Sequence, residues 1–205
     1  MGIFGNKRQG DTGFTIIELI IVIVVISILA AITLVAYPNY QKQTRDNERK
    51  SDLNQLATAL HTYAFQKNTF VGLASGCGRN GDGNGWVNAG ASQPGAGTYP
   101  RAISDCLLDI KAISNTSAFI DPSGCIYNSG STCGTSGATP TTAYMKATCT
   151  KSSVPTTYLF ARLETQPRQD SVIDGLCDGG SVSGYDATTQ LWGTNYGMNY
   201  YVVVK

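Results

Sequence analysis

The sequence predicts an α+β fold in which one long N-terminal helix packs on a small antiparallel sheet, with loops held by disulfides. Three observations predict it: an apolar segment that continues into an amphipathic one, strand-like patterns near the C-terminus, and six cysteines in Gly-rich sequence. At 205 residues the chain has room for one ordinary domain plus an additional segment. We therefore expect a leader at 1–13, a transmembrane helix at 14–37, an amphipathic continuation at 38–65 and an extracytoplasmic head at 66–205.

The segment Phe14–Tyr37 is the first predicted element. It holds 24 residues, and its polar members are Thr15, Glu18, Ser27 and Thr33. As a helix it would extend roughly 36 Å, which exceeds the about 30 Å of a bilayer's hydrocarbon core. Its β-branched residues are poor helix formers in water, but lipid forces a helix because every backbone polar group must be satisfied internally.

This segment differs from an ordinary secretory signal peptide and from a plain anchor. The apolar run is longer than a typical signal core, no A-x-A cleavage site closes it, and Glu18 lies in its first turns. An ionisable residue in a membrane segment is costly and therefore indicates a function. Basic residues lie on both sides of the segment, so the positive-inside rule does not decide its orientation.

A second helical pattern follows Pro38, where we expect the first helix to end or bend at Tyr37. Its first half is charged, with a surface ladder predicted for Lys42, Asp46 and Lys50 at i, i+4 spacing. Its second half carries an apolar stripe that needs a sheet as its partner. The stripe consists of Leu53, Leu56, Leu60 and Tyr63, so the globular part should begin near Leu53. His61 lies in this helix and is expected to be a packed or surface residue.

The rest of the chain divides into loops and strands. Residues 66–140 are rich in Gly, Ser, Asn and Thr, and within them Ala102–Ile113 suggests one short helix. Strands are expected at Tyr144–Cys149, Thr156–Glu164 and Tyr200–Lys205. The segment Gln166–Trp192 is expected to be a loop, and Trp86 and Trp192 are expected to pack in the core.

The cysteines predict a disulfide framework and hence export to an oxidising compartment. None of the six forms a C-x-x-C pair, and the sequence contains a single histidine. Six cysteines allow fifteen pairings, and the sequence does not choose among them. Our working hypothesis pairs neighbours in order: Cys77 with Cys106, Cys125 with Cys133, and Cys149 with Cys177.

The remaining motifs argue for no cofactor and no catalysis. Asn80, Asp82 and Asn84 place side-chain oxygens at alternating positions, like half of a calcium loop, but the final bidentate Glu is missing. The series Asp170, Asp174 and Asp178 is a second weak calcium candidate. No catalytic constellation is visible. Removal of residues 1–13 leaves 13 basic and 13 acidic residues, which gives no strong signal for nucleic-acid binding.

The stretch Gly13-Phe14-Thr15-Ile16-Ile17-Glu18-Leu19, after a short polar leader with Lys7 and Arg8, closely resembles the class III signal sequence of type IV pilins and pseudopilins. The resemblance covers about a fifth of the chain. It implies cleavage between Gly13 and Phe14 by a prepilin peptidase, N-methylation of the new Phe14 amine, and pairing of Glu18 with the N-terminus of a neighbouring subunit. The helix dipole and the freed amine both favour a carboxylate there. The fold that it implies is the pilin-like one.

Two classes of function follow. The first is a structural subunit, a major or minor pilin or a pseudopilin. It would lie in the cytoplasmic membrane before assembly, and the pilus assembly machinery would then add it to other pilin subunits in an extracellular or periplasmic filament. Adhesion, twitching motility, DNA uptake and secretion all remain open roles for that filament. The second is a membrane-tethered binding domain or enzyme that uses the helix as an anchor. Glu18 favours the first, because an anchor gains nothing from a buried acid.

Overall fold

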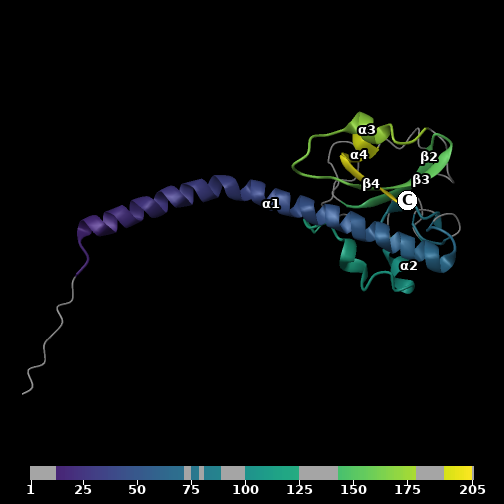
Figure 1. Cartoon of the computed structure of the whole chain (residues 1–205), viewed down its shortest axis with the longest axis horizontal. Coiled ribbons are helices and arrows are strands. Elements are labelled where there is room, and N and C mark those ends of the chain that lie inside the picture. The colour runs from purple at the N-terminus through teal and green to yellow at the C-terminus, as the bar shows by residue number, and fades with distance from the viewer. Residues whose placement is uncertain are drawn as a thin grey trace, which may run out of the picture. The chain divides into compact units, whose positions relative to one another are not determined.

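The structure is a computed structural model, and it describes residues 13–71, 75–78, 81–88, 100–124, 143–178 and 192–204. The chain divides into two compact units, residues 1–41 and 42–205. The first unit contains the N-terminal part of helix α1 (Ile16–Lys67), and the second contains the rest of that helix and the head. Figure 1 shows the elements with their labels.

Helix α1 includes Pro38 in its interior. Of the two expected outcomes at Tyr37, an end or a bend of the helix, the end is therefore wrong. Pro38 cannot donate a backbone hydrogen bond to the carbonyl of Leu34, but the helical assignment continues on both sides of it. The missing bond lies in an exposed part of the helix, where water or lipid headgroups can reach the carbonyl that it leaves free.

The head contains a four-stranded antiparallel sheet in the order β1-β2-β3-β4. Its strands are β1 (Gly85–Trp86), β2 (Met145–Lys151), β3 (Val154–Ala161) and β4 (Tyr200–Val204). The last three confirm the predicted strands with small shifts at their ends. Strand β1 lies in the region that we expected to be loops. It was not predicted because a strand of two residues shows no alternating pattern in the sequence.

The hairpin between β2 and β3 has a two-residue turn. Both turn residues, Ser152 and Ser153, have positive φ angles, of 48° and 66°. Positive φ at both central positions is the type I′ arrangement, whose twist matches that of the flanking strands. Serine has no special preference for this conformation, so neither residue predicts the turn.

Each face of the sheet carries a buried apolar cluster. On one face, the predicted stripe of α1 joins residues of α2 (Ile103–Asp109) and of β3 in one apolar cluster. This cluster includes Leu53, Leu56, Leu60, Ile103 and Leu159. Figure 1 shows the C-terminal part of α1 between the sheet and α2. The pairing of the stripe with the C-terminal sheet, and with it the α+β fold class, is confirmed.

The second face of the sheet carries another apolar cluster. It contains Trp86, Phe160 and Trp192, and the two tryptophans are 3% and 2% exposed. This confirms that both tryptophans pack in the core. The segment that we expected to be one loop contains a short helix, α3 (Asp170–Asp174). A second short helix, α4 (Trp192–Tyr196), begins at the last residue of that segment and places Trp192 against Phe160. A short 3₁₀ helix, η2 (Thr116–Phe119), is a further element that the sequence did not predict.

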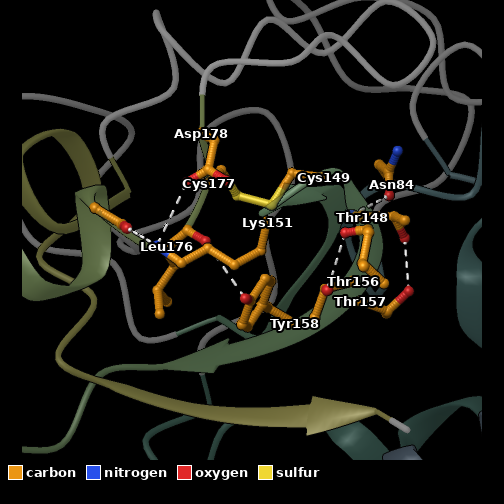
Figure 2. The surroundings of a disulfide bond; sticks show 12 residues. Asn84, Thr148, Cys149, Lys151, Thr156, Thr157, Tyr158, Leu176, Cys177 and Asp178 are labelled. Carbon is orange, nitrogen blue, oxygen red and sulfur yellow. Dashed lines mark hydrogen bonds and ion pairs between the residues drawn. A yellow bond between two sulfur atoms is a disulfide. The ribbon is translucent and has the colours of Figure 1, made fainter.

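Two disulfides connect loops to this framework. Cys77 is bonded to Cys106 of α2, and Cys149 of β2 is bonded to Cys177. Figure 2 shows the second bond with its surroundings. There the segment after α3 is also held by hydrogen bonds from the Lys151 ammonium to the Gly175 carbonyl (2.8 Å) and from the Tyr158 hydroxyl to the Leu176 carbonyl (3.3 Å). Cys125 and Cys133 lie outside the described residues, so their pairing stays a prediction.

Candidate functional site

The N-terminus of α1 is a capping box made by Thr15 and Glu18. The Glu18 carboxylate accepts hydrogen bonds from the backbone N–H and the hydroxyl of Thr15, at 2.8 and 2.6 Å. The Glu18 N–H donates in return to the Thr15 hydroxyl oxygen at 3.3 Å. In such a box two backbone donors that the helix leaves unpaired are satisfied reciprocally. Glu18 therefore has a local role within its own chain, which the sequence analysis did not assign although the T-x-x-E pattern encodes it.

The residues on either side of the expected cleavage bond have no structural partner that explains them. Phe14 is 89% exposed. A Cβ atom built on Gly13 would meet no atom within 4 Å, so the described fold has no steric need for glycine at this position. A requirement for Gly13 would therefore have to come from another molecule.

The surface of α1 from Ile16 to Leu34 is apolar and exposed. An 18-residue window of the helix reaches a mean hydropathy of 3.3, which together with its length is sufficient for a membrane span. Its hydroxyl groups bond to its own backbone: Ser27 donates to the Ile23 carbonyl (2.6 Å) and Thr33 to the Ala30 carbonyl (2.9 Å). Glu18 is thus the one charged residue in the sequence from Phe14 to Tyr37.

In the second unit, a cluster of charged side chains joins α1 to the head. Arg49 is fully buried and donates two hydrogen bonds to the Asp121 carboxylate, at 2.6 and 3.0 Å. It also donates to Asp46 at 2.8 Å and to Glu164 at 2.9 Å. Arg45 forms a second bidentate pair with Glu164, at 2.7 and 2.6 Å. We call these five residues the Arg49 cluster.

Asp46 shows why the predicted surface ladder is wrong. It is 2% exposed, and its carboxylate accepts hydrogen bonds from the backbone N–H groups of Glu164 and Thr165, each at 2.8 Å. The chain that leaves β3 thus contacts the charged face of α1. As a result the head begins to pack on α1 at Arg45, about two turns before the expected start at Leu53.

The electrostatics of the Arg49 cluster favour its ionised form. Burial lowers the pKa of Arg49, but the hydrogen bonds and charge of Asp121 outweigh it and raise the pKa above the ordinary value. Hydrogen bonding from Arg45 lowers the pKa of Glu164. Burial raises the pKa of Asp46, but donors from Thr165 and its neighbours make the net shift downward. The carboxylates of Asp46 and Glu164 therefore remain charged at neutral pH.

One turn farther along α1, Asp52 lies in a different environment. Its carboxylate accepts a 2.6 Å hydrogen bond from the Tyr144 hydroxyl, and both residues are buried. Burial raises the pKa of Asp52, and the Tyr144 hydrogen bond offsets only part of that shift. Asp52 therefore links α1 to the start of β2, and its ionised form costs stability because the charge is buried.

The first calcium candidate lies beside a lysine. Asn80 is outside the described residues, but Asp82 and Asn84 are buried. The Asn84 side-chain oxygen accepts from the Thr148 N–H at 2.9 Å and from the Lys146 ammonium at 3.4 Å, and that ammonium also donates to the Gly83 carbonyl at 2.8 Å. The lysine side-chain nitrogen thus occupies oxygen atoms that the motif would offer to a metal.

The second calcium candidate is dispersed. Asp174 accepts from the N–H and hydroxyl of Thr194, at 3.2 and 2.7 Å, whereas Asp170 pairs with Arg168 and Asp178 with Lys151. Among the residues that the structure describes, no group of three or more His, Cys, Asp or Glu side chains is placed to hold a metal ion. His61 is exposed and its ring lies edge-on to that of Phe70, with ring centroids 6.1 Å apart, which agrees with the expected packed or surface histidine.

Comparisons with known proteins find one family model and several relatives that match part of the chain. The family "Prokaryotic N-terminal methylation motif" matches residues 8–34. The type IV major fimbrial protein FimA of Dichelobacter nodosus is 37% identical over 90 residues, which are 42% of this chain and 58% of that protein. The type IV major pilin protein PilA of Myxococcus xanthus is 36% identical over 65 residues, 32% of this chain and 30% of that protein. A fimbrial protein of Pseudomonas aeruginosa is 36% identical over 67 residues, 33% of this chain and 44% of that protein.

These matches span between about a third and three fifths of each relative's own length. No solved structure matches the chain significantly. The family model covers the methylation motif and the first part of α1, and the fold of the head is described here by the structure.

Proposed function

From the similarity of its N-terminal segment to type IV pilins, we propose that the chain is a subunit of a pilus-like filament. The subunit is assembled through α1 after cleavage between Gly13 and Phe14. The observation that carries the proposal is the position of Glu18. This single acid lies three residues inside an exposed apolar helix, directly after a potential cleavage bond. In a filament the methylated amine of Phe14 in a neighbouring subunit is its natural partner.

The energetics support a role for the charge in assembly. A charged residue at the bilayer centre costs about 2.5–3.5 kcal/mol on insertion scales, and Glu18, only about 6 Å past Phe14, lies near the interface and costs less. Transfer into a filament core removes it from water and raises that cost unless a cation arrives. The membrane form would hold the processed subunit, with the disulfide-bonded head outside, until the assembly machinery extracts it.

The capping box makes it possible to separate charge from local structure. Glu18→Gln removes the charge but keeps a side chain that can bond back to Thr15, because glutamine also serves in a capping box. Thr15→Val removes the hydroxyl of the box and keeps the charge. Both variants and Glu18→Val would be expressed in the native cells, and surface filaments would be counted and measured by electron microscopy.

We expect Glu18→Gln and Glu18→Val to accumulate as processed monomer in the membrane with few filaments, and Thr15→Val to retain most filaments. Wild-type filament number and length in Glu18→Gln cells would contradict charge pairing and leave only the capping role. Absence of filaments from cells with the wild-type chain, under conditions where the protein is processed and abundant, would favour a membrane-tethered domain instead.

Processing is tested separately at Gly13. A methyl group there has room in the described structure, so Gly13→Ala should leave the fold unchanged. We expect it to slow removal of the leader because the peptidase then meets a larger side chain. N-terminal sequencing should find Phe14, N-methylated, in the wild-type chain. A wild-type protein that starts at Met1, or after Ala31 or Ala36, would contradict the proposal.

A further inference from the structure

Lys146 is a fully buried lysine within β2, far in sequence from the segment on which the proposed assembly depends. Its ammonium lies against three oxygen atoms: the Gly83 carbonyl at 2.8 Å, the Thr148 hydroxyl at 3.2 Å and the Asn84 carboxamide at 3.4 Å. A lysine side chain is almost never fully buried unless its amine has a specific partner. What this amine does is therefore a question that the pilin similarity does not answer.

The Asn84 carboxamide is fixed next to that amine. Asn84 directly precedes β1, in which Gly85 pairs with Lys146 in the antiparallel register. Its side-chain oxygen accepts a 2.9 Å hydrogen bond from the Thr148 N–H, and Figure 2 shows Asn84 beside Thr148. The loop also passes closely over Gly78, where a Cβ atom would lie 2.5 Å from the Asn84 carbonyl oxygen. The Asn84 backbone is thus fixed against Gly78, and the Thr148 N–H fixes its carboxamide and polarises the C=O group.

A carboxylate completes the group. Asp82 is 6% exposed, and its Oδ1 accepts the backbone N–H of Asn84 at 2.9 Å, so its carboxylate lies beside the Asn84 backbone and its charge acts on Lys146. Burial lowers the pKa of Lys146 to about 7, although the negative charge of Asp82 acts in the opposite direction. Near neutral pH a large share of the amine is therefore unprotonated and carries a lone pair, which is the nucleophilic form.

We propose that Lys146 and Asn84 form an intramolecular isopeptide bond that is promoted by Asp82. The Lys146 Nζ lone pair attacks the Asn84 Cγ, and the Thr148 N–H stabilises the negative charge that develops on Oδ1. Asp82 accepts the proton that Nζ loses and delivers it to Nδ2. The Nζ–Cγ bond forms, the Cγ–Nδ2 bond breaks, and one ammonia leaves. The step needs no oxidant, metal or second substrate.

The cross-link would give the loop that carries β1 a covalent tie to the centre of the sheet. The two described disulfides join residues 77 with 106 and 149 with 177, so neither connects this loop to β2 directly. An amide bond, unlike a disulfide, also survives reducing conditions. In a filament subunit such a bond would keep β1 paired with β2 under tension.

Mass spectrometry of the purified full chain tests this directly. After reduction and alkylation, trypsin should release residues 80–101 joined to residues 112–151, because a modified Lys146 is no longer a cleavage site. The joined species should weigh one ammonia less than its two parts together. Asn84→Ala and Lys146→Met should each abolish it. Asn84→Asp should give a joined species of the same mass as the wild type, formed with release of water.

Asp82→Asn separates the chemistry from the fold. It retains an oxygen that can accept the Asn84 N–H but removes the group that moves the proton, so we expect an unjoined chain with both described disulfides intact. Recovery of residues 80–101 and 112–146 as separate wild-type peptides would overturn the proposal. So would an ammonia deficit confined to the linear peptide 80–101, since Asn84-Gly85 can instead cyclise to a succinimide. Full joining in Asp82→Asn would overturn the role of Asp82.

Discussion

Removal of the Arg49 guanidinium should destabilise the head more than any other single charge removal that we describe. Arg49→Met keeps the length and apolar contacts of the side chain but leaves Asp121, which is fully buried at its side chain, without its bidentate partner. Asp46, which is 3% exposed at its side chain, loses its arginine donor as well. The remaining arginine of the cluster, Arg45, pairs with Glu164, so the two buried carboxylates would lose their cation.

The expected cost follows from the burial of these charges. Removing one partner of a buried ion pair costs about 3–5 kcal/mol, because the other charge stays buried and uncompensated. For a chain of 150–250 residues each kcal/mol lowers Tm by about 2–4 °C, so Arg49→Met should lower it by about 6–20 °C. Arg49→Lys should lie between Arg49→Met and the wild type, since lysine keeps the charge and loses the fork of donors.

The assay is thermal and urea unfolding of the mature chain in detergent micelles, followed by circular dichroism and tryptophan fluorescence. Trp86 and Trp192 are buried in the sheet cluster and report on the head. Arg101→Met is a matched control, because its pair with Asp109 is exposed on both sides and should change stability by less than about 1 kcal/mol. A loss below about 1 kcal/mol in Arg49→Met would refute the reasoning from burial.

Three further predictions concern the head. Because the pKa values of Asp46 and Glu164 are lower in the folded state than their ordinary values of 3.8 and 4.5, their contribution to stability should be present above pH 4.5 and disappear as the pH falls through the lowered values. Urea titrations in steps of pH should show this loss, and a flat profile in the wild type would contradict it. The pKa of Asp52 is raised instead, so its ionisation costs stability above its ordinary value of 3.8; Asp52→Asn should stabilise the head at pH 7 and show no gain at low pH. An equal gain at both pH values would assign the effect to packing. The Cys149–Cys177 disulfide closes a loop with a sequence separation of 28, so the double change of both cysteines to serine should cost about 3.5 kcal/mol in the chain-entropy relation, measured by urea unfolding against the intact chain. A cost near zero would indicate that the hydrogen bonds around the segment hold it without the bond.

Much of the helix and of the sheet could be predicted from the sequence, because both have long periodic signals. The run from Phe14 to Tyr37 and the stripe that begins at Leu53 repeat over many turns, and no single residue decides them. Pro38 was ambiguous for the opposite reason: it predicted either an end or a bend of the helix, and the structure excludes the end. It is a local signal, and the helical residues on both sides outweigh the one hydrogen bond that proline removes.

The charged part of α1 was the element that local rules described least well. Lys42, Asp46 and Lys50 have the spacing of a solvated ladder, and spacing cannot show that the chain leaving β3 approaches that face. Glu18 shows the converse. Its capping box needs only residues three apart and could have been predicted from T-x-x-E. The resemblance to a filament signal predicted instead a partner in a neighbouring subunit.

By itself the sequence determined the features that depend on neighbouring residues: the apolar helix with one acid, the cleavage-like junction at Gly13, the stripe that requires a sheet, and the strands at the C-terminus. Only the tertiary structure decided which distant groups meet. It placed Asp121 and Glu164 on Arg49, and Lys146 against Asn84. The physical reason is that these contacts join residues between 62 and 115 positions apart. Their partners are determined by how the loops close over the helix and sheet, for which the chain carries no periodic signal.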